Sequence, residues 1–187
     1  QYRDLEAINA YRQRVEEARC QSSESMMAAL ALIGRDNART PMQWDASRYA
    51  GFTPADAATE PWIGVNPNHV EINAAEEFDD PDSVYGFYKK LIAMRHNSAT
   101  VATGEWNLVA ADSEQVYAFT RTGGDDTILV VVNLTDESAG LPGEVAELLG
   151  DGVAESQILL STYDVAHGVK SIARGELARW EGVVIQL

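Results

Sequence analysis

Cysteine is nearly absent from this chain of 187 residues, and histidine is rare. The single cysteine, Cys20, has no partner for an internal disulfide, and its neighbours lack the pattern of a thiol nucleophile or a metal cluster. A lone thiol is typical of proteins from a reducing compartment. We therefore expect a cytoplasmic protein with no metal site and no cofactor.

Positive charge is also scarce. The chain has 14 lysines and arginines against 29 aspartates and glutamates, which gives a net charge of -15. This balance repels nucleic-acid phosphates and anionic membranes, so neither is an expected partner. The longest apolar runs, residues 26–33 and 128–132, fall far short of the ~20 residues of a membrane span, and no secretion-signal pattern is visible.

Residues 34–45, with the sequence GRDNARTPMQWD, form the segment that the rest of the chain is organised around. Gly34 ends an apolar run, and Pro41 forbids an interior helical position, so a loop is predicted. Regular periodicity stays almost absent up to residue 80. Long irregular segments on a rigid scaffold are where binding groups are usually found.

Arg35 and Arg39 are the two arginines of this loop. A guanidinium offers a planar fork to a carboxylate or to a pair of sugar hydroxyls. The residue types alone leave two interpretations open. The arginines pin the loop to Asp36, Asp45 or distant acids, or they bind a ligand.

Two helical patterns precede the loop. An amphipathic helix is predicted over residues 3–19, and a second helix, capped by Ser23 or Ser25, carries apolar residues up to Ile33. Methionines at helical spacing in the second pattern indicate core packing rather than a soft-metal site.

A third helix is predicted over residues 82–97, after the loop. Asp82 or Ser83 is its expected cap, and apolar residues follow at the helical period. The acids around Pro81 lack the alternating ligands and glycine of a calcium loop, so they indicate a helix start.

Beyond Gly104 the apolar pattern changes to period two, with a hairpin turn at residues 123–126. This predicts a small antiparallel β domain that begins near residue 105. Its expected strands are residues 106–110, 116–122, 127–134, 157–163 and 183–187.

A histidine, two loop tryptophans and a glycosylation sequon can each be interpreted as functional or as purely structural. His69 has no metal-ligand partner except Glu71, so a solvent-facing or singly bonded histidine is expected. Trp44 and Trp62 can stack on sugars, although loop tryptophans more often anchor the loop. Asn133 begins a glycosylation sequon at the end of a core strand, where a chance match is expected.

The string RDNARTPMQWD is followed by AGFT, PWI, VNPN and EIN, ending at Asn73. These words, in this order and at short spacings, resemble the oligo-1,6-glucosidase branch of glycoside hydrolase family 13. The opening YRDLEAINAYRQRV suits the helix before this loop in those enzymes, and the final third suits their C-terminal β domain. The chain departs from the pattern at His69, commonly tyrosine, and at Ala74, commonly valine.

This resemblance implies an α+β chain that is the C-terminal part of a larger enzyme. Residues 1–104 would be the end of a catalytic (β/α)8 TIM barrel, with the active-site loop at 34–80 and the last barrel helix at 82–97. Residues 105–187 would be an antiparallel β-sandwich of Greek-key type. Without the missing N-terminal part, residues 1–104 are expected to be partly disordered or to self-associate.

The resemblance also implies an α-glucosidase that removes terminal glucose with retention, using an aspartate nucleophile and a glutamic acid/base. No family word that carries these carboxylates occurs here, so no catalytic residue is expected in this chain, which should be inactive alone. Arg35 is the implied substrate-binding residue, paired with an aspartate from an early barrel strand and closing the pocket around the non-reducing-end glucose. Arg39 is a weaker candidate at the pocket rim. The expected substrates are short oligosaccharides such as isomaltose or maltose.

Two other functions stay open. One is a sucrose-isomerising or transglucosylating relative, since the residues that select the linkage would lie mostly upstream. The other is a stand-alone, non-catalytic carbohydrate-binding or interaction module that uses Trp44, Trp62 and Trp106.

Overall fold

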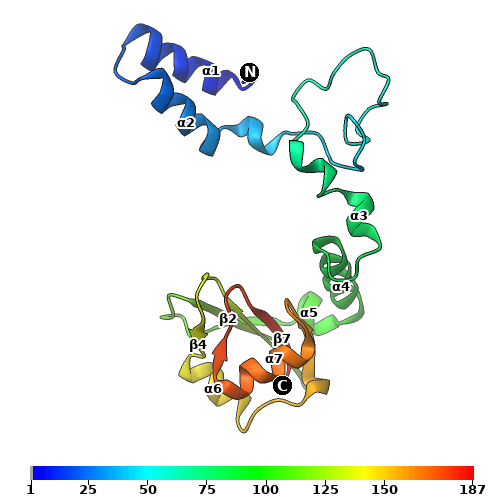
Figure 1. Cartoon of the computed structure of the whole chain (residues 1–187). Coiled ribbons are helices and arrows are strands. Elements are labelled where there is room, and N and C mark those ends of the chain that lie inside the picture. Colours follow the sequence, from blue (N-terminus) through cyan, green and yellow to red (C-terminus); the bar gives the residue numbers. More distant parts are fainter. Residues whose placement is uncertain (1) are drawn as a thin grey trace. The chain divides into compact units, whose positions relative to one another are not determined.

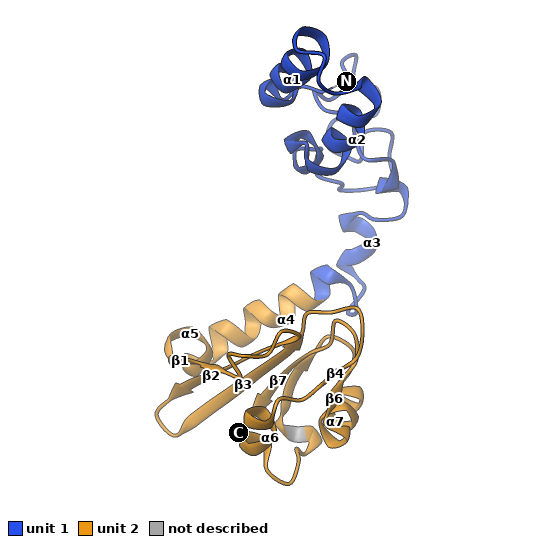
Figure 2. Ribbon diagram, turned by 90° about the vertical axis from the view of Figure 1, so that its left-hand side faces the viewer, with its two compact units in different colours: residues 1–86 blue, residues 87–187 orange. Residues whose placement is uncertain are grey.

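A computed structural model describes residues 2–187, and of Ser156 the backbone alone. The chain divides into two compact units, residues 1–86 and residues 87–187, drawn blue and orange in Figure 2. The predicted domain boundary at residues 104 and 105 stays a prediction. No helix within the described residues is long and apolar enough to cross a membrane.

The first unit begins with helix α1, Leu5–Tyr11, which continues directly into a π-helical turn, η1, Arg12–Glu17 (Figure 1). The helix predicted over residues 3–19 is thus present but changes its hydrogen-bond pattern midway. Helix α2, Ser23–Ile33, packs back on α1 through a small buried cluster. The cluster consists of Ala7, Met26 and Leu30.

The predicted cap of α2 was wrong by one residue or more. Ser22 is the cap, and its hydroxyl accepts a hydrogen bond from the Ser25 backbone N–H at 3.1 Å. Ser23 is already inside the helix, and Ser25 stands three residues beyond the cap, where its N–H needs an acceptor. The SSES run offered several candidates of equal propensity, and only the backbone geometry chooses among them.

The region from residue 34 to residue 80 is mostly irregular, as predicted, with three short helical turns. They are η2, Arg35–Ala38, η3, Pro67–Val70, and α3, Ala74–Phe78. A tight turn at Ala50 and Gly51 has positive φ at both residues, 53° and 64°. A Cβ on Gly51 would lie 2.6 Å from Asp45 Oδ2, so glycine suits this turn.

Helix α4, Val84–Asn97, is the helix predicted after the loop. The Ser83 hydroxyl caps it by accepting from the Gly86 N–H at 3.0 Å, while the Asp82 N–H donates to Asp80 Oδ1. A short helix that the sequence pattern did not predict, α5, Ala99–Thr103, follows it with Ser98 as cap.

The second unit is built on a five-stranded antiparallel sheet of order β1-β2-β3-β7-β5. Its strands are β1, Glu105–Val109, β2, Val116–Gly123, β3, Asp126–Asn133, β5, Ile158–Ser161, and β7, Gly182–Gln186. A second sheet pairs β4, Ala139–Gly140, with β6, Glu176–Leu177. The predicted antiparallel β domain is confirmed, and its two sheets are very unequal in size.

Helices cover both faces of the large sheet (Figure 1). One face packs on α6, Gly143–Leu149, and α7, Val165–Arg174, which the sequence analysis did not predict. The other face packs on the α4 residues Phe87, Leu91 and Met94. The fully buried centre of this unit includes Leu129, Val131, Val183 and Ile185.

The Asn133 side chain is fully buried at the end of β3. Its amide nitrogen donates to the carbonyls of Glu137 and Ala178, at 2.7 and 2.8 Å, and its oxygen accepts from Thr135. A glycan on this nitrogen would remove a donor from a buried network. The sequon is therefore a structural feature of this turn.

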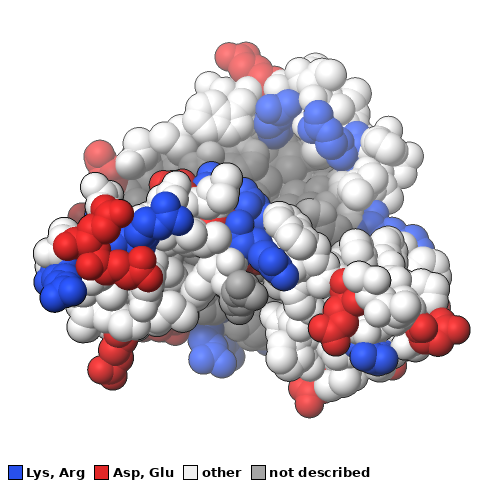
Figure 3. Space-filling model, turned by 90° about the horizontal axis from the view of Figure 1, so that it is seen from above, with Lys and Arg blue, Asp and Glu red and all other residues white. Residues whose placement is uncertain are grey.

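Charged side chains on the face drawn in Figure 3 are interspersed, basic with acidic, among larger uncharged areas. The excess of acids in the sequence therefore does not make this face uniformly acidic.

We predict that Leu129→Ala lowers the free energy of unfolding of the second unit by about 2–5 kcal/mol, because it leaves a cavity in a closed core. Leu129 is 0% exposed, whereas Leu159 in the same sheet is 41% exposed and provides the matched control. Urea denaturation followed by circular dichroism measures both. Equal losses in the two variants would contradict the assignment of this core.

Candidate functional site

Arg35 is the first residue of the η2 turn, directly after Gly34 ends α2. Its side chain forms a fork on the Asp4 carboxylate. The Nε atom donates to Asp4 Oδ2 at 3.0 Å, and Nη2 donates to Asp4 Oδ1 at 2.6 Å. This bidentate geometry is the strong form of an arginine–carboxylate pair, because both hydrogen bonds are charge-assisted and share one plane.

Asp4 is well placed to hold this guanidinium. It is the N-cap of α1, where its Oδ1 accepts from the Glu6 N–H, and its side chain is only 6% exposed. The Arg35 side chain is 53% exposed. The buried carboxylate therefore anchors an arginine whose outer part is open.

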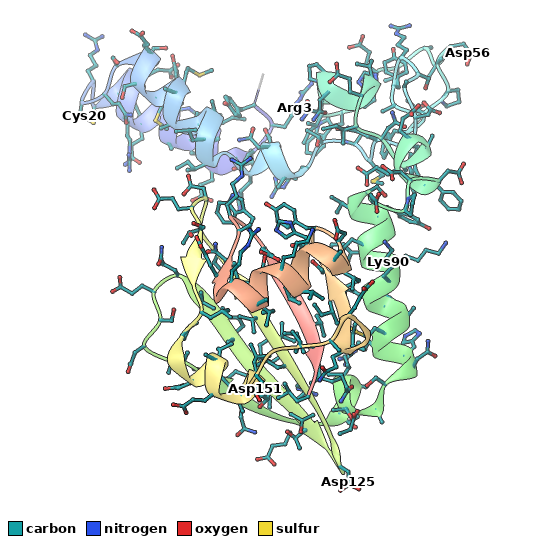
Figure 4. The ribbon with its side chains drawn as sticks, turned by 60° about the horizontal axis from the view of Figure 1, so that its bottom comes forward. Arg3, Cys20, Asp56, Lys90, Asp125 and Asp151 are labelled. Carbon is teal, nitrogen blue, oxygen red and sulfur yellow. The ribbon has the colours of Figure 1, made fainter. Side chains whose placement is uncertain are left out.

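Asp36, in the loop, also forms hydrogen bonds to the start of the chain. Its Oδ2 accepts the backbone N–H groups of Arg3, at 2.5 Å, and of Asp4, at 3.0 Å. Arg3, labelled in Figure 4, marks the place where the start of the chain meets the loop. Each of the two segments thus supplies one carboxylate to the other.

Arg39 lies at longer range from the same two acids. Its Nη1 is 3.9 Å from Asp4 Oδ1 and 3.9 Å from Asp36 Oδ1, so it contributes charge without a close hydrogen bond. Asp36 Oδ1 is buried, and within the described part of the chain it accepts no hydrogen bond. The positive charges of Arg39 and Arg35 both act on the Asp36 carboxylate.

The electrostatics of the pair keep both partners charged. The hydrogen bond from Arg35 lowers the pKa of Asp4 below the usual value for aspartate, while burial works in the opposite direction. The same hydrogen bond raises the pKa of Arg35 above its usual value. A charged fork is therefore present at neutral pH.

What Arg35 can bind depends on which of its nitrogen atoms are not already bound to acids. Nε and Nη2 are occupied by Asp4, and Nη2 also lies 3.0 Å from Glu6 Oε2, a residue that is 77% exposed. Among the described residues, Nη1 has no hydrogen-bond partner. The donors of Nη1 can therefore bind a further acceptor, either a carboxylate or a sugar hydroxyl.

The structure supports the interpretation that the arginines pin the loop to acids, and it brings Arg35 and Arg39 together around Asp4. Asp36 was a named candidate partner, and Asp4 is one of the distant acids that were expected as partners, although the sequence did not single it out. Asp45 pairs with neither arginine; hydrogen bonds from Ser47 lower its pKa. An aspartate directly before a helical pattern is an N-cap signal, and that signal could have drawn attention to Asp4. The binding of substrate by Arg35 and Arg39 stays a prediction.

The other candidates are more scattered. Trp44 and Trp62 are exposed in the first unit and Trp106 is exposed in the second. His69 Nδ1 pairs with the Asn66 carbonyl oxygen at 2.9 Å, which fits a singly bonded histidine. In the part of the chain that the structure describes, no three histidine, cysteine or acidic residues gather in a metal-binding group.

A cavity of about 540 Å³ in the first unit lies beside the cross-link. Trp62 and Asp36 are both on its wall. Asn37, Thr40 and Glu60 supply further polar groups. Arg35 and Arg39 are not on its wall.

The family of the chain follows from its match to known proteins. Residues 5–104 match the family model of the α-amylase catalytic domain, and residues 107–155 match that of the maltogenic amylase C-terminal domain. The chain therefore belongs to the α-amylase family, glycoside hydrolase family 13.

The curated proteins that this chain is similar to are much longer than the chain itself. An oligo-1,6-glucosidase of Bacillus cereus is 38% identical over 189 residues, which is 100% of this chain and 32% of that protein. An α-glucosidase of Pediococcus pentosaceus is 48% identical over 123 residues, which is 66% of this chain and 21% of that protein. The chain thus spans about a third or less of the length of these curated relatives.

The chain is also similar in fold and sequence to solved enzyme structures. The trehalulose synthase from Pseudomonas mesoacidophila superposes with a TM-score of 0.79 at 35% identity, over 99% of this chain and 31% of that one. A mutant of the same enzyme, with a TM-score of 0.79, 35% identity and the same coverage, has been solved in complex with its substrate sucrose.

We predict that the Asp4 carboxyl of the folded protein titrates below the usual aspartate range of about 3.9. Because its folded-state pKa is lowered, its contribution to stability is present above the unfolded-state pKa and is lost as the pH falls through the folded-state value. Carboxyl-carbon NMR across this range measures the shift. In the Arg35→Ala variant Asp4 should titrate at higher pH, and an unchanged curve would contradict the fork.

Proposed function

We propose that this chain is part of an α-glucosidase that removes terminal α-linked glucose from short oligosaccharides with retention of configuration. The observation that carries the proposal is the match of residues 5–104, which include the Arg35 fork on buried Asp4, to the α-amylase catalytic domain. The similarity to proteins named oligo-1,6-glucosidase supports the substrate class. Isomaltose and maltose are the proposed substrates.

The proposed reaction needs two carboxylates that this chain does not supply. A retaining glycosidase uses one carboxylate as nucleophile and a second as acid and then base, with the carboxyl groups about 5–5.5 Å apart. We assign these roles to a part of the enzyme outside this sequence, in keeping with the greater length of the relatives. The chain alone is accordingly proposed to be inactive.

Arg35 has a defined task in this proposal. Its guanidinium pairs with an aspartate from an early barrel strand, outside this sequence, and reaches the hydroxyls at the far end of the non-reducing glucose, and its charge closes that end of the pocket. A closed end admits one terminal glucose and stops a polymer from passing through, which makes cleavage exo. Arg39, more loosely paired, shapes the rim.

The proposed organisation places the end of a (β/α)8 barrel in residues 1–104 and the β domain in residues 105–187. The boundaries of the two family matches, at residues 104 and 107, support this division. The missing N-terminal part of the enzyme is the proposed intramolecular partner. An exposed, unpaired Cys20 is compatible with a cytoplasmic location.

A second function, sucrose isomerisation, is favoured by one observation: the structural similarity to a trehalulose synthase. Both reactions would use the same arginine at the closed end of the pocket. Product analysis of the complete enzyme on sucrose, maltose and isomaltose separates them. Glucose released from isomaltose supports hydrolysis, and an isomeric disaccharide formed from sucrose supports isomerisation.

We predict that Arg35→Ala in the complete enzyme lowers kcat/KM for isomaltose by about 10- to 150-fold. This range corresponds to the loss of hydrogen bonds from a charged donor. Steady-state kinetics measure it. Arg35→Lys should not restore the wild-type value, because an ammonium cannot hold a carboxylate and a hydroxyl with one rigid fork.

Arg174→Ala is the matched control for this experiment. Arg174 is an exposed arginine in the last turn of α7, in the second unit. Its variant should keep the wild-type kcat/KM. Wild-type turnover of the Arg35→Ala enzyme would refute the proposed role of Arg35.

We also predict uneven protection from hydrogen exchange in the 187-residue chain by itself. The first unit has a small buried cluster and exposes Leu32 and Ile33, whereas the second has a closed core. Amides of α1 and α2 should therefore exchange faster than those of β3 and β7, and should slow when the rest of the enzyme is present. Uniform protection in a purified monomer of this chain would contradict the prediction.

A further inference from the structure

We propose that Asp4 is a positioning residue of the active site: by occupying Nε and Nη2 of Arg35, it directs the remaining nitrogen, Nη1, at the substrate. The inference rests on the proposed function, because it assumes that Arg35 contacts the sugar. It adds a residue from the start of the chain to a site that the sequence pattern located only in the loop.

The Asp4 carboxylate is itself fixed in place. The side chain is 6% exposed, and its Oδ1 caps α1. Its backbone N–H donates to Asp36 Oδ2 at 3.0 Å. Main chain and side chain of Asp4 are therefore both restrained before Arg35 is considered, which is what a positioning group requires.

The fork on Asp4 fixes the orientation of the Arg35 guanidinium. Two parallel hydrogen bonds, at 3.0 and 2.6 Å, fix the plane and the rotation of the guanidinium together. The other close acid, Glu6, approaches only Nη2 and is 77% exposed, so it cannot set the plane alone. Arg39 adds no competing donor at hydrogen-bond distance, since it stays 3.9 Å from Asp4.

Holding Arg35 in advance also favours the binding of substrate. A long, half-exposed arginine loses side-chain entropy when it must hold one direction. A carboxylate that holds the guanidinium before substrate binds removes this entropic cost from the binding step. It also keeps the donor correctly oriented relative to the reacting glycosidic bond. Asp4 therefore acts on the reaction through Arg35, without contact to the sugar.

Asp4→Asn separates this role from the structural one. Asparagine caps a helix about as well as aspartate, so α1 keeps its N-cap. The amide has nearly the same shape but no charge and only one acceptor oxygen, so it cannot accept both bonds of the fork. The variant thus loses the bidentate hydrogen bonding to Arg35 and keeps the N-cap of α1.

The experiment is a double-mutant cycle in the complete enzyme with Asp4→Asn, Arg35→Ala and the double variant. We expect Asp4→Asn to lower kcat/KM for isomaltose roughly tenfold or more, because a displaced donor disrupts alignment. In the Arg35→Ala background the same change should alter kcat/KM by less than about twofold. Equal losses in both backgrounds would overturn the inference, because they would mean that Asp4 acts independently of Arg35.

The other outcomes are also decisive. If Arg35→Ala leaves kcat/KM unchanged, the proposed function of Arg35 fails together with the inference. If Arg35→Ala lowers it and Asp4→Asn does not, only the inference fails. The control is Asp164→Asn, which makes the same exchange at the N-cap of α7, where Asp164 accepts from the His167 N–H at 2.7 Å. This control should keep wild-type kinetics.

A second variant covers the case in which Asp4→Asn does not fold. Asp4→Glu keeps the charge and moves the carboxylate outward by one methylene. It should lower kcat/KM by displacing the guanidinium. Wild-type kcat/KM in this variant would overturn the inference, because it would mean that the exact position of the carboxylate is unimportant.

Discussion

The arginine–carboxylate fork between Arg35 and Asp4 joins two segments that lie 31 residues apart in the chain. Asp4 is the extended N-cap residue directly before α1, and Arg35 begins the turn after α2, so the fork closes the helical hairpin at its open end. Asp36 strengthens the closure by accepting two backbone N–H groups from the other segment. The loop that follows starts from this cross-link, and the direction of Arg35 depends on it.

The two units differ in what stabilises them. The second unit has a sheet covered by helices on both faces and a continuous buried core, so hydrophobic burial dominates there. The first unit buries few apolar side chains and relies on caps, ion pairs and turns. Polar contacts of this kind contribute little net free energy but define geometry closely. This suits a region whose proposed task is to position one side chain.

Much of the architecture could be predicted from the sequence, because it depends on local periodicity. The helical pattern before the loop, the helix at Val84–Asn97 and the alternation along β2 and β3 all appear where the pattern placed them. Helices α6 and α7 were missed for physical reasons. Helix α6 has only seven residues, and α7 contains Gly168, a poor helix former. A Cβ at Gly168 would lie 3.2 Å from Ile158 Cδ1, so tertiary packing explains the glycine.

The site was predictable only in part. The loop arginines stand out from their neighbours, and the words around them identify the family. The choice of Asp4 as partner is a tertiary fact, since many acids compete for Arg35 in an acidic chain. Local signals marked Asp4 as a helix cap at most. Its second role follows from the fold that brings the start of α1 against the η2 turn.

The central claim is that Asp4 holds Arg35 so that one guanidinium nitrogen meets a glucose. A crystal structure of the complete enzyme with glucose bound tests it most directly. We expect Nη1 of Arg35 at hydrogen-bond distance from a sugar hydroxyl, with Nε and Nη2 still on the Asp4 carboxylate. A bound glucose that leaves Arg35 turned to solvent, or an Arg35 that contacts the sugar after releasing Asp4, would contradict it.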